Sequence, residues 1–192
     1  MIKAGFKLRR HCVAFVGSVA LSMSMLMPTA QAADGDVTEY KLNNGLRIVV
    51  KEDHRSPTVA HMVWYKAGSI DEYNGTTGVA HVLEHMMFKG TKNLKVGEFS
   101  ETVAALGGRD NAFTSRDYTA YFQQLQAKDL SKVMALEADR MANLVLSESE
   151  FKKEIQVVME ERRYRTDDQA TGKLYEAFMA TAFQANPTRY PV

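Results

Sequence analysis

Cysteine is almost absent from this sequence. Cys12 is the only one among the 192 residues, so a fold held by disulfides is excluded. Neither sign of charge dominates, with 24 Lys+Arg against 23 Asp+Glu, which gives no electrostatic basis for binding nucleic acid. No internal repeat or low-complexity segment occurs. An apolar share of 45% is that of an ordinary globular protein and excludes a wholly disordered chain.

Acidic residues are missing from the start of the chain, where none precedes Asp34. The basic residues Lys3, Lys7, Arg9 and Arg10 come first, an apolar stretch runs from Val13 to Met27, and Ala30-Gln31-Ala32 follows. This order predicts a secretory signal peptide over residues 1–32, cleaved after Ala32. The apolar stretch is short for crossing a bilayer, and no later segment resembles a membrane span. We therefore expect an exported protein, periplasmic or secreted in a Gram-negative bacterium, with no stable membrane span after cleavage.

Removal of the signal would change the charge of the protein. The basic residues would fall from 24 to 20 against an unchanged 23 acids, so the formal net charge would move from +1 to −3. The remaining domain, residues 33–192, would contain no cysteine.

The order of the predicted elements indicates an α+β fold. Residues 37–50 are predicted to form a hairpin around Asn44-Gly45, and residues 58–65 a third strand. Helices are expected from about Thr77 and over 96–106, then short strands at 111–114 and 118–122. Further helices are expected over 130–146, from the capping box Ser147-Glu148-Ser149-Glu150 past Arg165, and over about 172–183. Strands that precede helices without alternation favour an antiparallel or mixed sheet packed by helices on one side.

The segment His81-Val82-Leu83-Glu84-His85 carries the clearest chemical signal. Residues four apart lie on one face of a helix, so both imidazoles can reach one metal ion. Glu84 shares that face and can take the proton of an activated water. Two neutral imidazoles suit zinc. A catalytic zinc site needs a third protein ligand and leaves its fourth position to water.

Two glutamates on the helix after the capping box can supply that ligand. Glu154 and Glu161 are seven residues apart and therefore fall within roughly 20° of each other around a helix. They lie on or beside an apolar stripe formed by Phe151, Val157 and Val158. Glu160 projects toward the polar side. A carboxylate that faces a core needs a cation, which is either a metal ion or an arginine among Arg162, Arg163 and Arg165.

Three segments resemble, in order, motifs of the pitrilysin/insulysin family of zinc metallopeptidases, which includes mitochondrial processing peptidase. They are His81 to Thr91, Gly107-Gly108 with Asn111-Ala112-Phe113-Thr114, and Val157 to Glu161. The resemblance covers essentially the whole chain after residue 32. It implies the N-terminal, zinc-bearing half of the pitrilysin-type fold over residues 33–192, truncated at its C-terminal end.

The resemblance also implies roles for individual residues. The family's distal zinc ligand lies about 75 residues beyond the second histidine and seven after a helper glutamate, which selects Glu161 over Glu160 and Glu154 as the helper. One zinc ion per chain would be held by His81, His85 and Glu161, and Glu84 would be the general base. The substrate cleft, where an extended peptide adds to a sheet edge, would be lined by Phe88, Asn111, Ala112 and Phe113.

Members of this family usually have two similar halves, on one chain or on two subunits, that close over the substrate. The expected partners are therefore a peptide substrate and either a C-terminal half or a second family subunit. Three functions remain open for this chain: a zinc metalloendopeptidase, a non-catalytic assembly or scaffold subunit, and an inactive zinc-binding fragment. Loss of the glutamate in the histidine motif would mark the scaffold case, and Glu84 is present.

Overall fold

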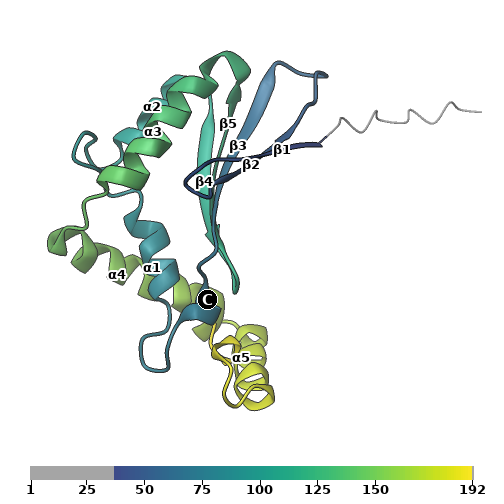
Figure 1. The fold of residues 1–192 in the computed structure, drawn as a ribbon. Coiled ribbons are helices and arrows are strands. Elements are labelled where there is room, and N and C mark those ends of the chain that lie inside the picture. The colour runs from purple at the N-terminus through teal and green to yellow at the C-terminus, as the bar shows by residue number, and fades with distance from the viewer. Residues whose placement is uncertain (1–36, 192) are drawn as a thin grey trace, which may run out of the picture. The chain divides into compact units, whose positions relative to one another are not determined.

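The computed structural model describes residues 37–191, so the signal peptide predicted for residues 1–32 lies outside the described part. The chain divides into two compact units, of which the first ends at Glu52 and the second begins at Asp53 (Figure 1). Within residues 37–191 no helix has the length and apolar character needed to cross a membrane.

The first unit contains an antiparallel hairpin. Strand β1 (Val37–Lys41) pairs with β2 (Arg47–Lys51) in a register that sets Tyr40 opposite Ile48. The connecting turn is closed by a hydrogen bond from the Leu46 N–H to the Asn44 side chain, and Gly45 adopts a φ of 89°. Glycine enters this left-handed region without steric cost. The hairpin predicted around Asn44-Gly45 is confirmed.

The second unit is built on a three-stranded antiparallel sheet. Its strands are β3 (Thr58–Tyr65), β4 (Arg109–Thr114) and β5 (Thr119–Gln126), in the order β3-β5-β4. Alternate residues of β5, including Tyr121 and Leu125, are buried, and the residues between them become more exposed toward the end of the strand. In this sheet β4 is an edge strand, which leaves one row of its backbone groups without a strand partner.

Helices cover one face of this sheet (Figure 1). They are α1 (Val79–Met86), α2 (Glu98–Ala105) and α3 (Leu130–Asn143), and the chain continues through α4 (Glu148–Arg162) and α5 (Ala170–Ala182). The apolar core between layers contains Phe99, Val103, Leu125 and Val133. The α+β architecture with helices on one side is therefore confirmed, and the helix and strand boundaries lie within a few residues of those expected.

Helix α4 begins with the predicted N-cap, because the Ser147 side chain accepts a hydrogen bond from the Glu150 N–H. The capping box is not reciprocal, however, since the Glu150 carboxylate pairs with Lys153. The expected apolar stripe does not face a core, since Phe151 and Val157 are 45% and 51% exposed. The helix continues into a π-helical turn, Arg163–Asp167. The helical periodicity predicted the helix correctly, but the positions of Phe151 and Val157 did not identify its buried face.

A buried ion pair within α3 lies against the sheet. Arg140 and Glu137 are 1% and 2% exposed, and their side chains lie 2.6 Å apart. The guanidinium also stacks over the rings of Phe88, Phe99 and Tyr121, at 5.1, 4.3 and 4.6 Å from their centroids. A buried charge is stable only when it is paired in this way. The ring contacts of Arg140 therefore connect α3 to Phe88, after α1, and to Tyr121 of β5.

Candidate metal centre

Helix α1, which carries the histidine motif, is held at its N-terminus by an acidic side chain. The two carboxylate oxygens of Glu72 accept hydrogen bonds from the N–H groups of Gly78 and Ala80, each at 2.8 Å. A carboxylate at this end satisfies free backbone donors and interacts favourably with the helix dipole. Gly78, with a φ of 86°, turns the chain into the helix. No motif in the sequence indicates this role for Glu72.

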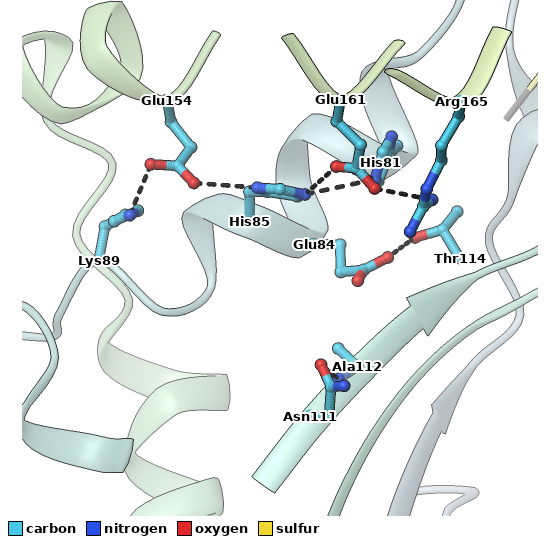
Figure 2. Close-up of polar contacts among 10 residues, drawn as sticks. All are labelled: His81, Glu84, His85, Lys89, Asn111, Ala112, Thr114, Glu154, Glu161 and Arg165. Carbon is cyan, nitrogen blue, oxygen red and sulfur yellow. Dashed lines mark hydrogen bonds and ion pairs between the residues drawn. The ribbon is translucent and has the colours of Figure 1, made fainter. Parts of the chain in front are cut away.

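Three side chains from two helices converge on one point (Figure 2). The Nε2 atoms of His81 and His85 are 3.3 Å apart, and Oε2 of Glu161 lies 3.5 Å and 3.3 Å from them. These three residues form a group whose donor atoms could hold a metal ion. In a tetrahedral zinc site with bonds of about 2.0–2.1 Å, neighbouring ligand atoms are separated by about 3.3–3.4 Å. Both the donor types and their spacing therefore fit zinc.

Burial favours the metal-binding form of His81. Desolvation lowers its pKa below the ordinary value, and the neighbouring His85 acts in the same direction, whereas the Glu161 carboxylate opposes the shift. The neutral imidazole that results has a free lone pair, as a metal ligand must.

Glu154 supports His85 from the side away from this group. Its Oε1 lies 2.9 Å from Nδ1 of His85, and its Oε2 lies 2.5 Å from the Lys89 ammonium (Figure 2). Burial raises the pKa of the Glu154 carboxyl, but the hydrogen bonds from Lys89 and His85 outweigh it and leave the pKa below the ordinary value. An ionised Glu154 accepts the Nδ1 proton of His85, which leaves the Nε2 lone pair directed toward Glu161 and His81.

Each of the two adjacent glutamates of α4 pairs with a different arginine. Arg165 contacts Oε1 of Glu161 at 2.7 Å, while Arg163 pairs with Glu160, whose side chain is 69% exposed. Glu160 therefore points to solvent, as the sequence predicted. The cation that pairs with Glu161 is Arg165, one of the three arginines expected for this role. The cation beside Glu154 is Lys89, which the helical pattern does not predict.

A pocket of about 340 Å³ opens beside the three converging residues. Its lining also includes Glu84, Arg165 and residues 111–114 of β4. The carboxylate of Glu84 lies outside the three-residue group and accepts a hydrogen bond from Thr114 (Figure 2). The structure thus brings Asn111, Ala112 and Phe113 to the pocket.

Phe88 lies elsewhere. It is not among the residues that line the pocket, and its ring is 6.2 Å from that of Tyr121 and beneath the Arg140 guanidinium. Its role in the substrate cleft remains a prediction that this placement does not support.

The fold is an α+β layer structure whose pocket contains a histidine-glutamate group that could hold a metal ion. A family model described as "Insulinase (Peptidase family M16)" matches residues 47–192. This chain therefore belongs to the insulinase family, as its motifs predicted.

Similar proteins include a zinc protease and a subunit of the cytochrome b-c1 complex. The zinc protease PqqE of Helicobacter pylori is 46% identical over 76% of this chain and 33% of its own length. Cytochrome b-c1 complex subunit 1 of Rattus norvegicus is 37% identical over 76% of the chain and 30% of its own length. The crystal structure of the first half of the periplasmic protease PqqL from Escherichia coli has a TM-score of 0.71 and 28% identity, over 81% of this chain and 36% of that one. The chain thus spans about a third of the length of the curated relatives it matches.

Proposed function

We propose that this chain is the zinc-bearing half of an exported metalloendopeptidase that hydrolyses peptides or unfolded polypeptides. The observation that carries the proposal is the convergence of His81, His85 and Glu161 beside Glu84 in one pocket. Membership of a peptidase family, and similarity to proteins named zinc proteases, support the same conclusion.

One zinc ion per chain would be held by His81, His85 and Glu161. A zinc ion there supplies Lewis acidity toward water and toward the carbonyl group of a peptide bond. Glu154 keeps His85 in the tautomer whose Nε2 is free, and Lys89 keeps Glu154 ionised. Arg165 holds one oxygen of Glu161 and leaves the other directed at the two imidazoles.

Glu84 is proposed as the general base. It lies in the pocket without belonging to the metal-binding group, so its carboxylate can take the proton of the water that attacks the scissile carbonyl carbon. As the C–N bond breaks, the same carboxyl group passes that proton to the leaving amine. The water oxygen and its second proton remain on the new carboxyl group, which then loses that proton to the amine or to solvent, and Glu84 returns to its ionised state.

The edge of β4 is proposed to bind the substrate backbone. The Ser115 N–H donates to the Tyr118 carbonyl, and the alternation of an antiparallel ladder then directs the Ala112 N–H to the free edge. That N–H meets the side chain of Asn111, at 2.9 Å from Oδ1. A peptide that adds as a strand would take over this donor, which places Asn111, Ala112 and Phe113 along the substrate.

A second half is proposed to complete the protein, either as a continuation of the chain or as a partner subunit. The length of the relatives supports this inference. Similarity to a protein named as a cytochrome b-c1 complex subunit keeps a non-catalytic assembly role as the alternative. The presence of Glu84 beside the metal-binding group favours the enzyme.

The substitution Glu84→Gln tests the proposal directly. The variant should retain zinc, because Glu84 is not a ligand, and should lose at least roughly a hundredfold of peptidase activity because the general base is gone. The assay measures cleavage of an unstructured fluorogenic peptide by the zinc-loaded chain with its second half supplied. Glu160→Gln, at an exposed position, is the matched control. Equal cleavage by Glu84→Gln and wild type would refute the mechanism, and no cleavage by either would favour the assembly role.

A further inference from the structure

A hydroxyl group on the edge strand holds the carboxylate of Glu84. Thr114, the last residue of β4, donates a hydrogen bond from Oγ1 to Oε2 of Glu84 (Figure 2). Among residues 37–191 no other side chain forms a hydrogen bond or ion pair with that carboxylate. The terminal torsion of a glutamate has a broad energy profile. The orientation of this carboxylate therefore depends on one bond.

The neighbouring hydroxyl cannot replace that of Thr114. Thr119 lies opposite Thr114 in the β4–β5 register and is 6% exposed. Its Oγ1 is 3.4 Å from Oγ1 of Thr114 but only 2.9 Å from the carbonyl oxygen of Ala67, to which it donates. Each hydroxyl has a single proton. The proton of Thr119 is therefore engaged by Ala67, and the donor to Glu84 is Thr114 alone.

This bond connects the two elements that must be aligned for the reaction. Glu84 is carried by α1, and Thr114 is carried by β4, whose residues 111–113 line the same pocket. A peptide added to the edge of β4 takes its position from that strand. A hydrogen bond from the strand to Glu84 therefore fixes the base relative to the substrate backbone.

We propose that Thr114 is a positioning residue that orients Glu84 toward the attacking water. The inference rests on the proposed role of Glu84 as general base. A hydroxyl donor suits this task because it is neutral and holds one oxygen without pairing the carboxylate with a cation. Glu154 shows the contrast, since Lys89 binds it as an ion pair. A displacement of a reacting group by about 1 Å costs on the order of a hundredfold in rate.

The test compares Thr114→Val, which removes the hydroxyl at nearly constant shape, with Thr114→Ser, which retains it. Thr102→Val is the matched control, because Thr102 donates its hydroxyl to the Glu98 carbonyl within α2, away from the pocket. All variants are made in the zinc-loaded protein with its second half, and zinc content, kcat and KM on one unstructured peptide are measured.

Thr114→Val should keep its zinc and a KM within about twofold of wild type, and should lose about ten- to a hundredfold in kcat. Thr114→Ser should recover kcat to within about threefold. Crystal structures provide a readout independent of activity: Glu84 should occupy one orientation in wild type and Thr114→Ser, and more than one in Thr114→Val.

Three results would overturn the assignment. One is a kcat of Thr114→Val close to that of wild type. A loss of zinc and thermal stability in parallel with activity would equally count against it, because that pattern indicates a structural role. The third is a single, unchanged Glu84 orientation in crystals of Thr114→Val. If the wild type cleaves nothing with its second half present, the proposed function fails, and the crystallographic comparison still decides whether Thr114 orients Glu84.

Discussion

Adjacent residues on one helix can have opposite environments, and α4 shows this at Glu160 and Glu161. Glu160 is solvent-exposed and paired with Arg163, whereas Glu161 directs one oxygen at two imidazoles. A helix turns by about 100° per residue. That rotation is enough to separate a surface ion pair from a candidate metal ligand.

The two glutamates should therefore respond differently to the same change. Glu161→Gln should lower zinc affinity by at least about tenfold, because an amide oxygen is a weaker ligand than a carboxylate. Glu160→Gln should leave zinc binding unchanged. Elemental analysis and competition with a chelator measure both. Equal zinc content in the two variants under competition would argue against Glu161 as a ligand.

The site shows which residues sequence can identify. The spacing of His81 and His85 predicts that they share one face of a helix, and the resemblance to the family selects Glu161 as the third ligand. Lys89 could not be found in this way, because its partner Glu154 is distant in sequence and the two meet only through the packing of α1 against α4. For the same reason the sequence does not predict the hydrogen bond that the Thr114 hydroxyl donates to Glu84, although Thr114 belongs to one of the recognised motifs.

Lys89 provides a test of how Glu154 is held. The pKa of Glu154 is lowered in the folded protein, so its favourable interactions are present above its ordinary pKa of 4.5 and are lost as the pH falls through the lowered value. In zinc-free protein, Lys89→Met should reduce the free energy of unfolding by about 1–2 kcal/mol near pH 7. That difference from wild type should shrink as the pH falls below the ordinary value of 4.5 and through the lowered pKa of Glu154, since the carboxyl group then becomes protonated in both proteins.

Lys152→Met is the control, since Lys152 and Glu148 form an ion pair with both side chains more than two-thirds exposed, at 71% and 81%. Urea unfolding across a pH series measures all three proteins. A stability loss in Lys89→Met that is no greater than in Lys152→Met, or that is independent of pH, would contradict the interpretation.

At the scale of elements, α3 is attached to the sheet by charge as well as by apolar packing. The Gln123 side chain of β5 contacts Glu137, and His61 of β3 contacts Gln123 at 2.7 Å. A chain of polar contacts therefore runs from the helix across two strands. The order of elements predicted the layers, but it gave no indication that a buried ion pair lies between them, because Arg140 and Glu137 look like ordinary surface residues of an amphipathic helix.

Breaking this pair on one side should be costly. Arg140→Met leaves Glu137 buried without a cation, and we expect a loss of about 3–5 kcal/mol in the free energy of unfolding. The double variant Arg140→Met with Glu137→Leu should recover part of that loss, because no unpaired charge remains. Lys152→Met, which removes the exposed pair with Glu148, should cost less than about 1 kcal/mol. A single variant Arg140→Met as stable as Lys152→Met would show that the buried pair does not stabilise the packing of α3.

At the scale of the whole molecule, the predicted signal peptide and the described fold do not overlap. The first strand begins at Val37, so cleavage after Ala32 leaves every described helix and strand intact. The candidate metal centre lies much later in the chain, between His81 and Glu161. The exported form would therefore carry the complete centre. Residues 33–192 contain no cysteine, so an oxidising compartment could form no disulfide among them.

Export is tested with the natural N-terminus in a Gram-negative host. The basic head, the apolar stretch and Ala30-Gln31-Ala32 predict a periplasmic protein that begins at Ala33. Intact-mass measurement and N-terminal sequencing of the periplasmic fraction check both statements. Ala32→Arg is the matched control, because a large charged residue before the cleavage point should block processing and cause the uncleaved precursor to accumulate. A wild-type chain that begins at Met1 and remains in the cytoplasm would show that residues 1–32 are not a signal peptide, without changing the assignment of the metal centre.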